Sequence, residues 1–216
     1  MTEIVAELSG NHGGSLQNAH RLIDAAKASG ADAVKFQCFS PERQAIKRNR
    51  PDVLAIVDAH HGGEPLLDLY YRVWTPWTWF PALIAHCKDI GIPWFSSVFA
   101  PEDVEYMESL SCPRYKISAW EIGALDWQLI KAVKETGKPV VMSVRQAPGV
   151  IILDATDYNG EFVTLGLSAH GAILPHVDAP MVEYHLKLDG VETPDSKFSL
   201  TPAEFARMAT LMGRIV

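Results

Sequence analysis

The chain has 216 residues, 48% of them hydrophobic, and a formal net charge of −7. This length suits one globular domain and lies near the lower limit for a closed (β/α)8 barrel, which typically needs about 250 residues. The acidic balance argues against a nucleic-acid partner and against a polybasic membrane anchor. Because the three cysteines lack paired spacing and no apolar run could cross a bilayer, we expect a cytoplasmic protein without a membrane partner.

Short apolar segments alternate with helical periodicity along most of the chain, which predicts a parallel sheet built from βα units. The first strand ends at Glu7, and Ser15 caps the helix after it. Further strands are expected at 33–37, 93–97, 114–117 and 139–143, and helices at 53–59, 66–73, 75–90, 101–110 and 126–136. The long segment from 39 to 74 is expected to cover a site. Its basic cluster, Lys47, Arg48 and Arg50, is expected to form a solvated face.

The rhythm changes after Ser143. Strands are expected at 150–153, 163–168 and 181–186, and a last helix at 201–212, but the first of these connections is too short for a crossover helix of about 10 residues. We therefore expect a trimmed (β/α)8 TIM barrel, in one domain over residues 1–216, with helices 5 and 6 missing and helix 7 vestigial. The bare apolar strand backs around Val150, Ile151 and Ile152 would then be buried in a homo-oligomer.

Nearly every apolar segment ends in a polar residue that can take part in catalysis or binding. These strand-end residues are Glu7, Lys35, Gln37, Ser96, Ser97, Lys116, Ser143, Ser168, His170, Glu183 and His185. The carboxyl ends of barrel strands open into loops on one face, so these side chains should surround a single mouth. Lys35 and Lys116 are costly at the ends of apolar strands unless they meet an anion. The pattern predicts an enzyme with an anionic ligand.

The same strand ends, read in order, resemble the sialic acid synthase family of phosphoenolpyruvate-condensing enzymes. The similar segments are Glu7-Leu-Ser-Gly-Asn-His-Gly, Gly30-Ala-Asp-Ala-Val-Lys-Phe-Gln37, Trp94-Phe-Ser-Ser-Val-Phe99, Tyr115-Lys-Ile-Ser-Ala-Trp-Glu121, Gly137-Lys-Pro-Val-Val-Met-Ser143, Gly166-Leu-Ser-Ala-His170 and Val182-Glu-Tyr-His185. Each motif is weak by itself, and their joint order carries the resemblance. It covers nearly the whole chain.

The resemblance implies a metal-dependent condensation of phosphoenolpyruvate with an N-acetylated aldose such as N-acetylmannosamine, giving a nonulosonic (sialic-type) acid and phosphate. It implies that phosphoenolpyruvate is bound by Lys35, Gln37, Lys116 and Ser143, and that Glu7, Glu121 and Lys116 are catalytic. It also implies that His170 and His185 bind a divalent metal. Two imidazoles with open positions and no nearby thiolate favour Mn²⁺ over structural Zn²⁺, with Mg²⁺ or Co²⁺ as alternatives.

The chain also departs from the family pattern. Arg145 stands where a glycine is usual, Trp120 replaces a small residue, and the family's antifreeze-like carboxyl-terminal domain is not expected here unless a separate chain supplies it. Two rival functions stay open. A 3-deoxy-octulosonate phosphate-type synthase would require Lys47, Arg48 and Arg50 to face the mouth, and a degenerate barrel would bind a ligand or partner without turnover. His12 fits a ligand role and a structural role equally well.

Overall fold

Eight strands hydrogen-bond in a closed cyclic order in the computed structural model. They are β1 (Glu3–Glu7), β2 (Ala33–Cys38), β3 (Trp94–Val98), β4 (Tyr115–Ile117), β5 (Val140–Ala147), β6 (Val150–Thr156), β7 (Phe162–Ala169) and β8 (Met181–His185). The structure describes residues 2–51, 54, 63–119, 121, 126–147, 150–156, 162–172 and 180–212, with only the backbone for 144–147, 150–156 and 162–167.

Seven of the eight strands run parallel, and β6 is the exception. It pairs antiparallel with both β5 and β7, so the prediction of a wholly parallel barrel is wrong at this strand. The cause is the length of the connection, because only residues 148 and 149 separate β5 from β6 and a parallel crossover needs many more. None of the described residues between β5 and β8 is helical. The vestigial helix that was predicted after the seventh strand falls on residues 173–179, outside the described part.

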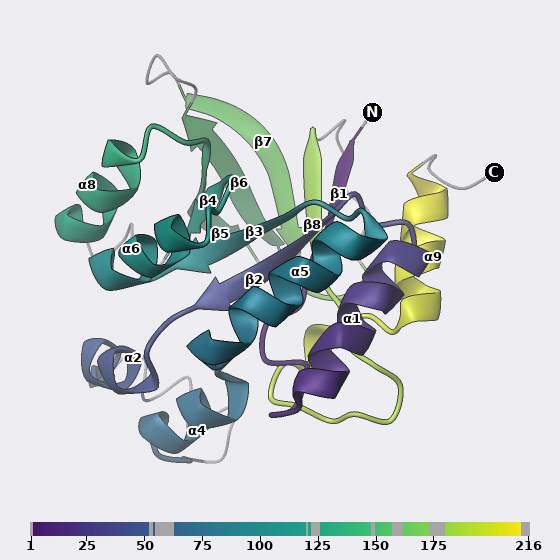
Figure 1. Ribbon diagram of the computed structural model, residues 1–216, viewed down its shortest axis with the longest axis horizontal. Coiled ribbons are helices and arrows are strands. Elements are labelled where there is room, and N and C mark those ends of the chain that lie inside the picture. The colour runs from purple at the N-terminus through teal and green to yellow at the C-terminus, as the bar shows by residue number, and fades with distance from the viewer. Residues whose placement is uncertain are drawn as a thin grey trace.

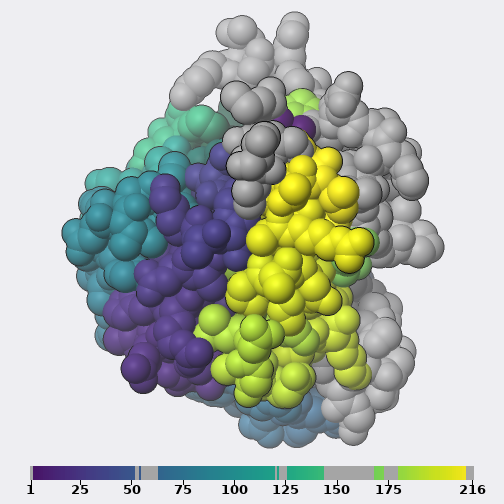
Figure 2. Space-filling view, turned by 90° about the vertical axis from the view of Figure 1, so that its right-hand side faces the viewer, coloured from purple at the N-terminus to yellow at the C-terminus, as the bar shows by residue number. Residues whose placement is uncertain are grey.

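Helices cover the rest of the barrel. The structure has α1 (Leu16–Ala28), α2 (Pro41–Lys47), α4 (Leu66–Val73), α5 (Phe80–Ile90), α6 (Pro101–Ser109), α8 (Trp127–Glu135) and α9 (Pro202–Leu211), with 3-10 turns η1 (Trp77–Trp79) and η2 (Ser196–Phe198). Helices α1 and α5 lie side by side on one face and α6 and α8 on another (Figure 1). In Figure 2, α9 lies against α1, which brings the last helix beside the first. No helix among the described residues is long and apolar enough to span a membrane.

Side chains on the inner face of the barrel form layers along its axis. At the amino end of the strands, Arg114 forms an ion pair with Glu3 at 2.8 Å and lies over the ring of Phe95. The next layer is an apolar plug of Val5, Ala33, Phe95, Val141 and Met181. Two residues further along each strand stand Glu7, Lys35, Ser97, Ser143 and Glu183, which are all buried. Because side chains alternate between the faces of a strand, the apolar plug is the floor under this polar layer.

The segment after β2 lies beyond the carboxyl ends of the strands. Ser40 caps α2, Pro41 is its first residue, and α4 packs against α2 in a pair at the lower left of Figure 1. The predicted helix at 66–73 is confirmed by α4, whereas the one at 53–59 lies mostly outside the described residues. This segment supplies side chains to the barrel mouth.

Candidate active site

A cavity of about 320 Å³ opens at the carboxyl ends of the strands. Described residues from seven strands, all but β6, line it, together with the segment after β2 and the loop after β8. The strand residues and those directly after the strands are Glu7, Lys35, Gln37, Ser97, Phe99, Lys116, Ser118, Ala119, Ser143, Ser168, His170, Glu183 and His185, and the others are Arg48, Leu69, Tyr70, Val73, Pro194, Asp195 and Phe198.

Glu183 stands at the centre of the ion pairs on the cavity floor. Its Oε1 accepts hydrogen bonds from Lys116 Nζ at 2.6 Å and from Ser168 Oγ at 2.8 Å, and its Oε2 lies 3.6 Å from Lys35 Nζ. Burial by itself would raise the pKa of the Glu183 carboxyl, but Lys116 and then Lys35 bring it well below its usual range. Glu183 therefore stays ionised and holds the two lysines near each other.

Lys35 joins this group to a second carboxylate, Glu7. The two form an ion pair, and Lys35 Nζ also donates to Ser97 Oγ at 3.0 Å. Burial lowers the pKa of Lys35 to about 7, although Glu183 favours its charged form. Glu7 Oε1 accepts from the backbone and hydroxyl of Ser9, each at 2.9 Å, and from Gln37 Nε2 at 3.3 Å. The floor is thus a buried network in which two ammonium groups and several hydroxyls can face an anionic ligand.

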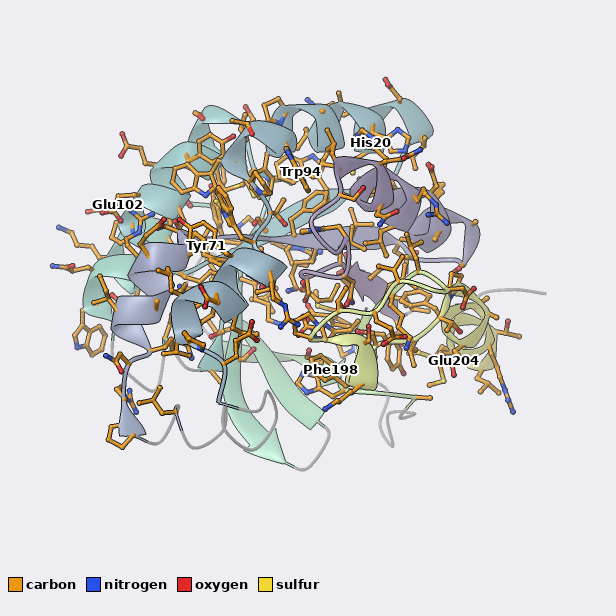
Figure 3. The ribbon with its side chains drawn as sticks, turned by 90° about the horizontal axis from the view of Figure 1, so that it is seen from below. His20, Tyr71, Trp94, Glu102, Phe198 and Glu204 are labelled. Carbon is orange, nitrogen blue, oxygen red and sulfur yellow. The ribbon has the colours of Figure 1, made fainter. Side chains whose placement is uncertain are left out.

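The two histidines lie beside this network. Their ring centroids are 5.2 Å apart, and Phe198 stacks on His170 at 4.8 Å while meeting His185 edge-on at 4.9 Å. Figure 3 shows Phe198 beside the last strands, inward of Glu204 on α9. Burial lowers the pKa of both imidazoles, and the proximity of His170 lowers that of His185 further. Since Ser9 Oγ lies 3.1 Å from Nδ1 of His185, the opposite ring nitrogen is left for another partner.

The cavity rim carries a second, separate set of ion pairs. Arg48, which follows α2, lines the cavity and its Nη2 lies 2.5 Å from Glu121 Oε1. Lys47 donates to Asp126 at 2.6 Å and to the Phe99 carbonyl at 2.8 Å. The prediction of a solvated face is therefore wrong for Arg48 and Lys47. Their ion pairs hold the segment after β2 against the loop after β4. Helical periodicity gives no information about residues just past the end of a short helix.

The structure brings seven of the eight predicted site residues around one cavity. These are Glu7, Lys35, Gln37, Lys116, Ser143, His170 and His185. The eighth, Glu121, is fully buried behind the rim, where it contacts Arg48 and accepts a hydrogen bond from Ser118. The chemical roles assigned to these residues remain predictions.

Sequence reasoning placed Ser97, Ser168 and Glu183 at the mouth without giving them a role, and it did not place Asp195 or Arg48 there. The structure confirms the position of the first three, each of which lines the cavity. Asp195 follows β8 in an irregular loop, and no periodicity could have placed it. Burial raises its pKa to about 6, against hydrogen bonds from Ser9 and the backbone of Gly10.

His12 has a structural role. It is buried, its Nδ1 accepts the backbone N–H of Gly14 at 3.0 Å, and its Nε2 lies 3.1 Å from Thr75 Oγ1. Its ring meets Trp79 edge-on at 5.4 Å. His12 therefore joins the first loop to the segment before α5 and does not line the cavity.

Comparisons with known proteins agree with this geometry. The NeuB family matches residues 22–149. Pseudaminic acid synthase of Campylobacter jejuni is 31% identical over 95% of this chain and 71% of its own length, and that of Helicobacter pylori is 33% identical over 92% and 69%. A crystal structure of N-acetylneuraminic acid (sialic acid) synthetase from Leptospira borgpetersenii superposes with a TM-score of 0.77 at 19% identity, over 99% of this chain and 83% of that one, which shows a shared fold. The predictions of an enzyme and of the sialic acid synthase family are confirmed: the chain belongs to the NeuB family.

Proposed function

We propose that this protein condenses phosphoenolpyruvate with an N-acetylated aldose to give a nonulosonic acid and phosphate. The observation that carries the proposal is the buried floor network, in which Lys35 and Lys116 lie with serine hydroxyls at the closed end of one cavity. Such a set of donors suits a ligand that carries both a phosphate and a carboxylate. The named relatives, two pseudaminic acid synthases, make acids of this class.

The residues present also fit a divalent metal. His170 and His185 face each other with imidazoles kept neutral by burial, which leaves lone pairs for coordination. No group of three or more His, Cys, Asp or Glu side chains arranged as a metal site occurs in the described part of the chain. An ion held by two histidines would keep coordination sites open for water and substrate, as catalytic ions do. We propose Mn²⁺ as this ion.

The chain's own residues account for the main steps of this reaction. Lys35 and Lys116 hold and charge-balance phosphoenolpyruvate, with Ser143 and Ser168 as hydrogen-bond donors beside them. Glu7, fixed by Ser9 and Gln37, positions the water that attacks carbon two while carbon three bonds to the aldehyde and phosphate leaves. A divalent ion held by His170 and His185 would supply a Lewis acid for the aldehyde oxygen. The apolar plug under the floor excludes bulk water from below.

Two aspects of assembly belong to the same proposal. We expect a homo-oligomer that covers the outer side of strands β5 to β7, where none of the described residues forms a helix, and an antifreeze-like domain on a separate chain as a candidate partner. Light scattering at micromolar concentration tests the first expectation. A monodisperse monomer would contradict it.

The decisive experiment is a phosphate-release screen with phosphoenolpyruvate, Mn²⁺ and a panel of N-acetylated hexosamines. We expect phosphate release that needs both an acceptor and the metal, and that is lost in Lys116→Ala. Lys138→Ala is the matched control, because Lys138 is also ion-paired, at 2.5 Å with Glu108, but lies outside the cavity. If phosphoenolpyruvate binds and no acceptor triggers release, the rival of a binding barrel without turnover gains support.

A further inference from the structure

We infer that the Arg48–Glu121 ion pair at the cavity rim selects an uncharged aldose acceptor and disfavours a sugar phosphate. The inference rests on the proposed function, since it concerns the second substrate of the same cavity. It starts from the finding that Arg48 lines the cavity while its charge is taken up by a carboxylate behind it.

The two rim residues are close together, and Glu121 is buried. Arg48 is 12% exposed, Glu121 is not exposed at all, and 2.5 Å separates their nearest atoms. Ser118 donates a second hydrogen bond to Glu121, which fixes that carboxylate in place. A phosphate that bound Arg48 would leave the buried Glu121 carboxylate with only Lys47, at 3.7 Å, and would lie beside that negative charge. Breaking one side of a buried pair in this way is strongly unfavourable.

Charge balance within the cavity leads to the same conclusion. Of the described residues that line it, Lys35, Lys116 and Arg48 are cationic, and each forms an ion pair with a carboxylate: Lys35 with Glu7, Lys116 with Glu183, and Arg48 with Glu121. Phosphoenolpyruvate already needs the two floor lysines. A second phosphate at the rim would find only Arg48 among these residues and would have to share that cation with Glu121.

The remaining rim residues also suit a neutral sugar. Leu69 and Val73 of α4 and Phe99 after β3 line the cavity together with Arg48 and Tyr70. Apolar and aromatic side chains with a few polar groups between them are typical of sites for small polar ligands. An ion pair offers such a ligand hydrogen bonds without requiring that it carry charge.

The test is a calorimetric titration of N-acetylmannosamine and N-acetylmannosamine 6-phosphate, with excess phosphoenolpyruvate and no divalent cation. Removing the compensating charge in Glu121→Gln leaves Arg48 charged, and we expect affinity for the 6-phosphate to rise by at least about tenfold relative to the neutral sugar. The double variant Glu121→Gln/Arg48→Gln should lose this gain. Glu108→Gln removes the ion pair of 2.5 Å with Lys138, which lies outside the cavity, and should not raise the affinity for the 6-phosphate.

Two results would overturn the inference. One is a parent protein that prefers the 6-phosphate, and the other is a Glu121→Gln variant whose preference does not change or does not depend on Arg48. Should neither sugar bind the parent, the Glu121→Gln comparison still decides. If that variant fails to fold, the preference of the parent protein between the two sugars decides. Phosphoenolpyruvate titrated alone tests the proposed function separately.

Discussion

The ammonium group of Lys116 on β4 lies 2.6 Å from the carboxylate of Glu183 on β8, although these strands stand opposite each other in the cyclic order of eight. The ion pair therefore crosses the inside of the barrel instead of joining neighbouring strands. Because Lys35 on β2 also approaches Glu183, at 3.6 Å, one carboxylate ties three strands together at the level of the cavity floor. A ligand that binds here must share the lysines with Glu183.

The first prediction concerns phosphoenolpyruvate binding. Charge-assisted hydrogen bonds from a lysine are worth about 1.5–3 kcal/mol, so Lys35→Ala and Lys116→Ala should each weaken binding by about tenfold to a hundredfold. Calorimetric titration measures the effect, and Lys138→Ala outside the cavity should bind like the parent. Equal affinities for the parent and both floor variants would remove the anion site and with it the synthase proposal.

The second prediction concerns stability. Lys116→Met leaves Glu183 with a single cation, and Glu183→Gln leaves Lys116 without its carboxylate partner, so each should destabilise the fold by about 3–5 kcal/mol. The destabilisation of the double variant should be smaller than the sum of the two single destabilisations by about 1 kcal/mol or more, because neither charge is then left without its partner. Urea unfolding of the four proteins measures this coupling. Strict additivity would show that the pair contributes nothing jointly.

The third prediction concerns the metal. His170→Ala or His185→Ala should abolish stoichiometric Mn²⁺ uptake and leave circular dichroism unchanged, since the rings rest on Phe198 at the cavity wall and not in the apolar core. His86→Ala is the matched control, because His86 pairs with Asp24 on the outer helices. A variant lacking both cavity histidines that still binds Mn²⁺ like the parent would refute the ligand assignment.

Strand-end residues of the site could be predicted because a parallel strand carries two signals at once. Its apolar stretch shows where it ends, and its alternation shows which side chains share a face. Lys35 and Ser143 were found by the first signal. Glu183 was placed at the mouth by the same signal, and it shares a face with His185 two residues later.

The direction of β6 and the position of Arg48 needed different information. An apolar strand has no intrinsic direction, and the length of its connection decides, so the six residues between Ser143 and Val150 already favoured an antiparallel hairpin over a parallel crossover. Arg48 lies in a segment after α2 whose path depends on ion pairs with residues from the loop after β4, far along the sequence. Such long-range pairs leave no local pattern.

The last prediction uses His12 as a reporter of acid stability. Burial lowers its pKa from 6.5 to about 4, and its Nδ1 must stay unprotonated to accept the Gly14 N–H. Below pH 6.5 the His12 ring binds a proton in the unfolded chain but stays neutral in the folded chain. Its contribution to stability is therefore fully present at neutral pH and falls as the pH decreases to about 4. Between pH 7 and 5.5 the parent should lose about 1 kcal/mol more than His12→Asn, whose side-chain oxygen can still accept from Gly14. Urea unfolding at both pH values gives the difference directly, and comparing the two proteins removes the titration of all other groups. Equal losses would mean that His12 titrates alike in the folded and unfolded chain.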